Sequence, residues 1–127
     1  MSDLQKQDAY TFAKTPTDIP IPGDKVIQEY IGRLNSSTES ISAAKMVAPP
    51  GWEEPRQIPE FDELTIVLSG KIQVEIDNEV IELQVDEPFI AHKRHFVRYS
   101  NPYDEPAEYW SICIPAFSIE TVNRDKE

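Results

Sequence analysis

The sequence predicts an all-β protein that folds as a small antiparallel barrel. Short runs rich in β-branched and aromatic residues recur along the chain, and several alternate apolar with polar side chains, as half-buried strands do. The chain contains 11 prolines and 4 glycines, so turns separate these runs at short intervals. With 127 residues, the chain has the usual size of one domain with one core.

The first residues form a segment of their own. Residues 15–24, TPTDIPIPGD, contain prolines that exclude a regular helix or a central strand. We expect residues 1–25 to be an extended, proline-rich N-terminal arm that runs over the surface or across a neighbouring subunit. Within this arm, residues 8–12 form either a short strand or an irregular stretch.

The barrel itself is expected at residues 26–117. Its predicted strands lie at residues 25–34, 39–47, 63–69, 71–77, 80–85, 89–92, 95–100 and 109–114. The first of these also suits a helical turn, whereas residues 71–77 alternate cleanly between apolar and polar side chains. Asp77-Asn78-Glu79 has the chemistry of a hairpin turn. After the barrel we expect a polar, mobile C-terminal tail, residues 118–127.

Charge and composition narrow the classes of partner. The net charge is −11. Proteins bind the negatively charged phosphate backbone of nucleic acids through clustered lysines and arginines, so we expect no nucleic-acid partner. No apolar run approaches the roughly 20 residues that a membrane-spanning helix needs, so we expect no membrane association. The single cysteine, Cys113, excludes an intramolecular disulfide. The N-terminal residues lack the apolar region of a signal peptide, and we expect a cytoplasmic protein.

Two stretches have the spacing of a known barrel family. Six residues separate Glu63 from Gly70, Pro50-Gly51-Trp52 supplies an upstream glycine, and FIAHKRHFVRYSNP covers residues 89–102. Together these stretches resemble the two motifs of the cupin superfamily over about residues 39–115. The resemblance implies a cupin-type antiparallel jelly-roll β-barrel. It does not specify an activity, because cupins include dioxygenases, decarboxylases, isomerases, epimerases and non-enzymatic binders.

The resemblance also implies a metal site, and this sequence lacks most of its ligands. A typical cupin metal is held by two histidines and a glutamate of the first motif and by a histidine of the second. Glu63 matches the glutamate, but the two histidine positions hold Gln57 and Pro59, or Arg56 and Ile58 with the longer spacing. Neither pair supplies metal ligands, so we expect no metal and no other cofactor.

In the second motif, His95 lies one or two residues before the position that the resemblance implies. That position holds Phe96 or Val97, depending on the register chosen. Because side chains alternate between the faces of a strand, His95 points inward in one register and outward in the other. One alternative route to a metal therefore stays open, an atypical site that combines Glu60 or Glu63 with His92 or His95.

The candidate ligand-binding residues are polar side chains that lie in or beside the implied barrel interior: Gln57, Glu63, His95, Arg98 and Tyr99. Glu63 is either a carboxylate at the barrel mouth that pairs with an arginine, or a general acid or base whose pKa is raised by burial. A buried set of Glu63, His95 and Tyr99 could bind a polar ligand or transfer protons without a metal.

Three functions compete. We predict a cupin that binds a small polar or anionic molecule in its barrel without a catalytic metal. The alternative is an enzyme that uses Glu63 with His95 or Tyr99, either for acid–base chemistry of the isomerase or epimerase kind or as an atypical metal-dependent oxygenase or decarboxylase. The third is a structural domain whose barrel is filled by its own side chains.

One strand also predicts the assembly. Residues 64–68, LTIVL, are apolar on both faces, and only one face of a barrel strand lines the interior. The other face must be covered, either by the N-terminal arm or by a second subunit. We therefore predict a homodimer.

Overall fold

The computed structural model describes residues 4–124 and contains no helix within that range. Its strands are β1 (Leu4–Lys6), β2 (Thr11–Ala13), β3 (Thr17–Asp18), β4 (Val26–Ile31), β5 (Ser42–Ala48), β6 (Asp62–Ser69), β7 (Ile72–Ile76), β8 (Glu79–Leu83), β9 (Phe89–Ala91), β10 (Val97–Ser100) and β11 (Ala107–Ile114). Every predicted barrel strand is confirmed. The ambiguous residues 25–34 form a strand, β4, and the strand expected from residue 95 begins at Val97.

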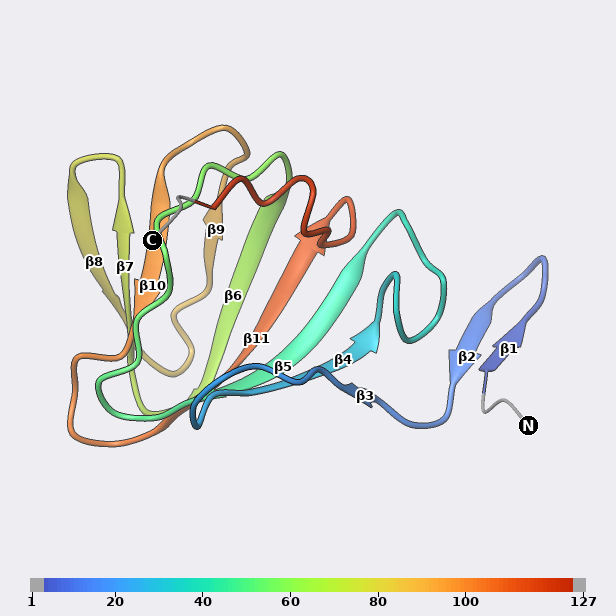
Figure 1. Ribbon diagram of the computed structural model, residues 1–127, viewed down its shortest axis with the longest axis horizontal. Coiled ribbons are helices and arrows are strands. Elements are labelled where there is room, and N and C mark those ends of the chain that lie inside the picture. Colours follow the sequence, from blue (N-terminus) through green and yellow to red (C-terminus); the bar gives the residue numbers. More distant parts are fainter. Residues whose placement is uncertain (1–3, 125–127) are drawn as a thin grey trace.

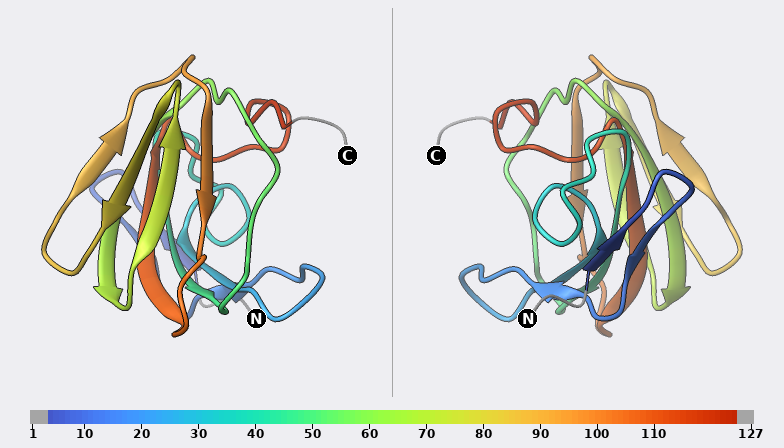
Figure 2. Two further views of the ribbon diagram at one scale, coloured as in Figure 1. Left: turned by 90° about the vertical axis from the view of Figure 1, so that its left-hand side faces the viewer. Right: turned by 90° about the vertical axis from the view of Figure 1, so that its right-hand side faces the viewer.

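Two antiparallel sheets face each other (Figures 1 and 2). The larger sheet has the strand order β3-β4-β5-β11-β6-β9, and the smaller has the order β10-β7-β8. All pairings in both sheets are antiparallel. This architecture confirms the all-β antiparallel jelly roll that the sequence predicts. No helix among the described residues is long and apolar enough to cross a membrane.

One part of the space between the sheets is filled by an apolar core. The alternation of β7 buries Ile72 and Val74 completely, as residues 71–77 predict. These side chains pack with Val67 from β6, Leu83 from β8 and Val97 from β10. The core therefore joins the two sheets at this end, and the remaining interior is available for other groups.

The turn between β6 and β7 requires glycine. Gly70 has φ = +73°, a conformation that side chains rarely adopt. A Cβ atom there would lie 2.4 Å from the carbonyl oxygen of Pro106. The glycine predicted to end the strand thus also allows the chain before β11 to approach closely.

Strands β6 and β11 place several polar or small side chains on their buried face, beside the core residues Val67 and Tyr109. In β11, Tyr109, Ser111 and Cys113 are buried, while Ile114 on the opposite face is 50% exposed. In β6, Glu63 and Thr65 are buried, while Leu68 on the opposite face is 42% exposed. Polar and small side chains therefore face inward where these two strands pair.

The connection between β5 and β6 runs beside β10. Its prolines, at positions 49, 50, 55 and 59, prevent a continuous strand because they lack the amide donor. Isolated backbone pairing with β10 remains at Glu53↔Ser100 and Gln57↔Val97. This irregular segment brings Glu54 and Gln57 to the barrel interior.

The residues expected to form the arm contain three short strands. β1 and β2 pair as a hairpin that lies away from the two barrel sheets (Figure 1). The Lys6 ammonium donates hydrogen bonds to the carbonyl oxygens of Ser36 and Ser37. β3 pairs with β4 at the edge of the larger sheet, so it adds a strand there and does not cover the outer face of β6.

The chain after β11 returns across the barrel, as the red segment of Figure 1 shows. Val122 is 1% exposed and packs with Phe61 and Cys113. The amide of Ile58 donates to the carbonyl oxygen of Asn123. The predicted polar tail is therefore packed on the barrel as far as Arg124, and residues 125–127 lie outside the described residues.

Candidate functional site

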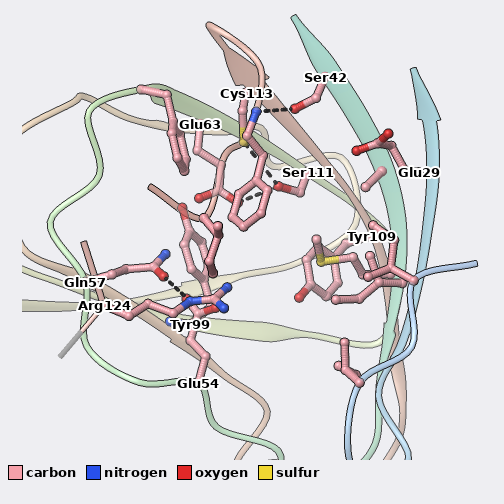
Figure 3. Close-up of a pocket in the computed structure, with 18 residues that line it drawn as sticks. Glu29, Ser42, Glu54, Gln57, Glu63, Tyr99, Tyr109, Ser111, Cys113 and Arg124 are labelled. Carbon is pink, nitrogen blue, oxygen red and sulfur yellow. Dashed lines mark hydrogen bonds between the residues drawn. The ribbon is translucent and has the colours of Figure 1, made fainter. Parts of the chain in front are cut away.

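A cavity of about 330 Å³ lies inside the barrel (Figure 3). Its apolar lining residues are Ile19, Ile21, Ile27, Ala44, Met46, Phe61, Phe117 and Ile119. Its polar or sulfur-bearing groups come from Glu29, Ser42, Glu54, Gln57, Glu63, Tyr99, Tyr109, Ser111, Cys113 and Arg124. The two kinds of lining suit a molecule with a polar end and an apolar body.

Glu63 is the acidic group contributed by β6. Its side chain is buried, and one carboxylate oxygen accepts a hydrogen bond of 2.5 Å from the Ser111 hydroxyl on β11. The two strands pair in a register that sets Glu63 opposite Cys113. Burial raises the pKa of Glu63, and the hydrogen bond from Ser111 opposes that rise.

Glu54 is a second acidic group in the same cavity. One of its carboxylate oxygens accepts a hydrogen bond of 3.1 Å from the backbone amide of Tyr99. Burial raises the pKa of Glu54 to about 8, and repulsion from Glu63 adds to the rise, while the positive charge of Lys25 opposes it. A carboxyl group with this pKa changes its protonation near neutral pH.

The Tyr99 hydroxyl faces the cavity without a partner. Tyr99 is 2% exposed, and its hydroxyl makes no hydrogen bond of normal geometry with any residue among 4–124. It lies near the Glu63 carboxyl and the Thr65 hydroxyl. Burial, together with the negative charge of Glu63, raises the pKa of Tyr99 well above its usual value. The phenol thus stays protonated and can donate to or accept from a ligand.

Lys25 lies next to the cavity at the start of β4. Its ammonium nitrogen is 3.0 Å from the Tyr109 hydroxyl and 3.3 Å from the centre of the Trp52 ring. Burial lowers the pKa of Lys25 to about 8, while the negative charges of Glu54 and Glu63 oppose that change. The aromatic contact provides a cation–π interaction for this buried charge.

Gln57 and Arg124 lie at one side of the cavity. The Arg124 Nε donates a hydrogen bond of 3.2 Å to the Gln57 side-chain oxygen. Gln57 is 3% exposed, whereas Arg124 is exposed. The arginine is therefore a cation at the boundary between the cavity and solvent.

Three of the five predicted site residues, Gln57, Glu63 and Tyr99, line this cavity together. The structure places the other two outside. His95 is exposed, and its Nδ1 lies 2.8 Å from an Asp77 carboxylate oxygen. Its inward placement required the strand to extend back to residue 95. The chain instead turns at Arg94, with φ = 68°, and β10 begins only at Val97.

Arg98 belongs to β10 but points to the face opposite Tyr99. Its guanidinium forms an ion pair of 2.9 Å with Glu53 and lies 3.8 Å from Glu75. Because side chains alternate along a strand, the burial of Val97 and Tyr99 forces Arg98 outward. Arg98 is therefore not an arginine that pairs with Glu63, and its predicted place among the ligand-binding residues is wrong.

The residues present do not fit the metal that the cupin resemblance implies. No histidine lines the cavity, and the Gln57 amide oxygen is hydrogen-bonded to Arg124. Among residues 4–124, no three His, Cys, Asp or Glu side chains are grouped so that they could hold a metal ion. The atypical site does not assemble either. Glu60 instead contacts Arg94 and Asn123 on the surface, and His92 and His95 are exposed.

Motif spacing did not identify Lys25, Glu54, Ser111 or Arg124. For two of them, Lys25 and Ser111, alternation was a usable signal. Lys25, just before β4, is in phase with the inward Ile27 and Glu29, and Ser111 lies between the inward Tyr109 and Cys113 of β11. Glu54 lies in a proline-rich segment without a regular period, and Arg124 comes from the chain end. Only the tertiary structure brings these two to the cavity.

The fold and the cavity together define a small barrel of the double-stranded β-helix type with a polar interior pocket. The chain belongs to the Cupin domain family, whose sequence profile matches residues 44–115. The resemblance noted in the sequence is thereby confirmed.

Solved structures with this fold come from proteins of diverse description. An uncharacterised conserved protein with a double-stranded β-helix domain from Klebsiella pneumoniae has a TM-score of 0.67 at 20% identity, over 85% of this chain and 90% of that chain. Oxalate decarboxylase from Bacillus subtilis has a TM-score of 0.74 at 13% identity, over 86% of this chain and 30% of that chain. At these identities, the similarity concerns the fold.

A protein named endoribonuclease YbeY, from Myxococcus xanthus, is similar in sequence. The two are 38% identical over 107 residues, which are 84% of this chain and 36% of that protein. The chain thus spans about a third of the length of this relative.

Proposed function

We propose that this cupin barrel binds a small molecule with a polar end and an apolar body. The observation that carries the proposal is the cavity itself, which Glu63, Gln57 and Tyr99 line together. A barrel filled by its own side chains would leave no such space. The polar side chains on the inner faces of β6 and β11 support the same conclusion, because burying polar groups does not by itself stabilise a fold.

The unpartnered Tyr99 hydroxyl also supports a ligand. A buried hydroxyl without a hydrogen bond is unfavourable by roughly 1–3 kcal/mol, and the Tyr99 hydroxyl faces the cavity in this condition. A ligand group that bonds to it would remove this cost. The apolar side chains of Ile27 and Met46, which also line the cavity, would contact the rest of the molecule.

A thermal-shift screen with a cavity-filling variant tests the proposal. The screen uses neutral, cationic and anionic fragments of about ten non-hydrogen atoms, and a ligand raises the melting temperature by mass action. Ala44 lines the cavity, whereas Val80 is 66% exposed on the smaller sheet, away from the cavity. We expect a fragment that stabilises the wild type and Val80→Phe but not Ala44→Phe. A screen without any stabilising fragment, or with equal shifts in both variants, contradicts the proposal.

A second candidate is an enzyme that transfers protons within this cavity. The observation that favours it is the pair of buried carboxyl groups, since perturbed pKa values are common at catalytic sites. Glu54, with a pKa raised to about 8, suits a general acid or base near neutral pH. Tyr99 could be the second proton-transfer group. His95 has no part in this candidate, because its side chain is on the surface.

Deuterium exchange tests the enzyme candidate. Pyruvate and glyceraldehyde carry exchangeable C–H bonds next to a carbonyl, and NMR in D2O would follow their exchange with the protein present. Exchange above the protein-free rate that Glu54→Gln abolishes and Glu53→Gln retains supports the candidate. Equal rates with and without the protein contradict it for this class of substrate.

We also propose that the chain forms a homodimer through the outer face of the larger sheet. Leu68, Ile90 and Ile114 are exposed on this face by 42%, 45% and 50%, and the N-terminal strands do not cover it. A second copy is the covering surface that we favour.

We do not propose nuclease activity for this chain. It spans only about a third of the Myxococcus relative, and its net charge of −11 opposes RNA binding.

A further inference from the structure

Three carboxyl groups line the cavity. Glu29 accepts hydrogen bonds from the backbone amides of Leu34 and Asn35, while Glu54 and Glu63 lie beside Tyr99 without a direct counter-charge. Neither Glu54 nor Glu63 forms an ion pair with any residue among 4–124, and their direct partners are the Tyr99 amide and the Ser111 hydroxyl. Buried carboxylates are normally paired with a cation, or they take up a proton. The pair therefore leaves negative charge or bound protons inside the barrel.

The two basic side chains nearest to these carboxyl groups are engaged elsewhere. The Lys25 ammonium lies against the Trp52 ring and donates to the Tyr109 hydroxyl. The Arg124 guanidinium donates to Gln57 at the solvent boundary. Both charges act on the carboxyl groups from a distance, but neither occupies the space that these groups line.

A second observation, on Tyr99, points to a ligand in that space. Tyr99 is 2% exposed and lines the cavity, and its hydroxyl makes no hydrogen bond of normal geometry with residues 4–124, although the Glu63 carboxyl and the Thr65 hydroxyl lie near it. Figure 3 shows its side chain in the same part of the cavity as Glu54 and Glu63. Three oxygen-bearing groups thus face one space, and each has capacity to accept a further hydrogen bond.

We propose that the ligand of this cavity is a small primary amine, bound as an ammonium ion beside Glu54, Glu63 and Tyr99. The inference rests on the proposed function, because it specifies the charge of the molecule that the cavity binds. An ammonium group has three donors and no acceptor, which complements these groups. The apolar body of the amine lies against apolar lining residues such as Ile27 and Met46.

The protonation of the site is consistent with this assignment. Burial and mutual repulsion raise the pKa of Glu54, and burial raises that of Glu63. A bound positive charge acts in the opposite direction and lowers both values. Binding of an amine near pH 7 therefore releases protons, which calorimetry detects as a dependence of the binding enthalpy on the ionisation enthalpy of the buffer.

Three probes of similar shape separate charge from size. Benzylamine, benzyl alcohol and benzoate share an aromatic ring and differ in whether the polar end is cationic, neutral or anionic at pH 7. Isothermal titration calorimetry on the full chain measures their affinities and the accompanying proton release. We expect benzylamine to bind about tenfold or more tightly than the other two, because hydrogen bonds between charged groups are the stronger ones.

Matched variants locate the effect. Glu54→Gln and Glu63→Gln keep the shape of the cavity, and each should reduce the preference for benzylamine over benzyl alcohol. Glu53→Gln is the control, because Glu53 is adjacent in sequence, 58% exposed and paired with Arg98 outside the cavity. It should retain the wild-type preference and the proton release.

The remaining outcomes overturn the inference in distinguishable ways. If benzyl alcohol or benzoate binds as tightly as benzylamine, the ligand is not an amine, while small-molecule binding in the cavity stands. An amine preference that both cavity variants retain places the site elsewhere. If none of the three probes binds, the amine assignment is wrong, and the thermal-shift screen with Ala44→Phe decides separately whether the cavity binds any fragment.

Discussion

Glu54 shows how position alone changes the chemistry of one residue. Its neighbour Glu53 has the same side chain, yet Glu53 pairs with Arg98 on the outside while Glu54 faces the cavity. Burial raises the pKa of Glu54 to about 8, so the folded protein holds a proton that the unfolded chain releases at lower pH. The ionisation of this residue is therefore linked to stability.

The first prediction concerns this linkage. Between pH 4.5, the ordinary pKa of Glu54, and about 8, the folded state binds more protons than the unfolded state. The free energy of unfolding therefore falls as pH rises, by up to about 1.4 kcal/mol per pH unit for one proton. Lys25, with its pKa lowered to about 8 from 10.5, acts in the opposite direction above this window. Urea denaturation at several pH values measures the slope.

Variants test whether Glu54 causes the fall of the free energy of unfolding with rising pH. Glu54→Gln should flatten the fall between pH 5 and 8, and Glu63→Gln should do so in part because burial also raises the pKa of Glu63. Glu53→Gln should leave the slope unchanged. Parallel pH profiles for the wild type and Glu54→Gln would show that Glu54 ionises normally in the folded protein.

A second prediction at the residue scale concerns Gly70. Gly70→Ala places a Cβ atom 2.4 Å from the Pro106 carbonyl oxygen in addition to the strain of a positive φ. Gly51 also has a positive φ, +85°, but nothing lies within 4 Å of a Cβ atom there. We expect Gly70→Ala to lower the free energy of unfolding by about 2 kcal/mol more than Gly51→Ala. Equal losses in chemical denaturation would show that the turn moves away without cost.

At the scale of elements, β6 and β11 explain why the barrel has a cavity. Their inward side chains include Glu63, Ser111 and Cys113, which are too polar or too small to fill the interior as an apolar core does. Where β7 contributes Ile72 and Val74, the interior is packed. The barrel therefore has one end filled by side chains and one end with space for a ligand.

The C-terminal segment closes part of this space. Phe117, Ile119 and Arg124 line the cavity, and Val122 anchors the segment against Phe61. The segment adds backbone hydrogen bonds to the connection between β5 and β6, from Ile58 to Asn123 and from Glu60 to Thr121. A part of the chain expected to be mobile thus contributes to the candidate site.

The third prediction tests this anchor. Val122→Ala removes two methyl groups from a side chain that is 1% exposed, and we expect a loss of about 2 kcal/mol in the free energy of unfolding. Ile119→Ala is the control, because Ile119 is 65% exposed and should change stability by less than about 0.5 kcal/mol. If both variants unfold at the wild-type urea concentration, the segment does not contribute to the stability of the barrel.

At the scale of the whole molecule, several apolar side chains lie on the outer face of the larger sheet, outside both the core and the cavity. The outer face of the larger sheet combines Leu64 and Ile66 of β6 with Trp110 and Ile112 of β11, which pair directly in the strand register. Tyr30 of β4 packs edge-on against Trp110, with ring centres 4.8 Å apart. An apolar patch of this kind, bordered by Lys45 on β5, is typical of a surface that another protein covers.

The fourth prediction is the size of the particle in solution. Light scattering coupled to size-exclusion chromatography should give about 29 kDa, twice the chain mass of 14.5 kDa. Ile112→Lys places a charge in the outer face and should give the monomer mass. Val80→Lys is the control, because Val80 is 66% exposed on the separate, smaller sheet. A wild-type mass near 14.5 kDa would contradict the dimer.

Much of the architecture could be predicted from local patterns in the sequence. Alternation of apolar and polar side chains located β7. Turn chemistry located the hairpin turn at Asp77 that leads into β8, and Gly70 marked the end of β6. These features depend on local chemistry, since side chains alternate along a strand and a positive φ favours glycine or a short polar residue. The family resemblance placed Gln57, Glu63 and Tyr99 in or beside the barrel interior. All three line the cavity in the structure.

The sequence by itself thus determined the strands, the turns and the absence of the histidines typical of cupin metal sites. Only the tertiary structure decided which polar groups meet inside the barrel. His95 lies outside the cavity because the chain turns at Arg94 and β10 begins only at Val97. The alternation of β10 therefore does not extend back to residue 95. Lys25 and Arg124 act on Glu63 because segments far apart in the chain converge, and Glu54 does so because the irregular segment before β6 turns inward. Such convergence depends on sheet order and on the path of irregular segments, and no local periodicity encodes either.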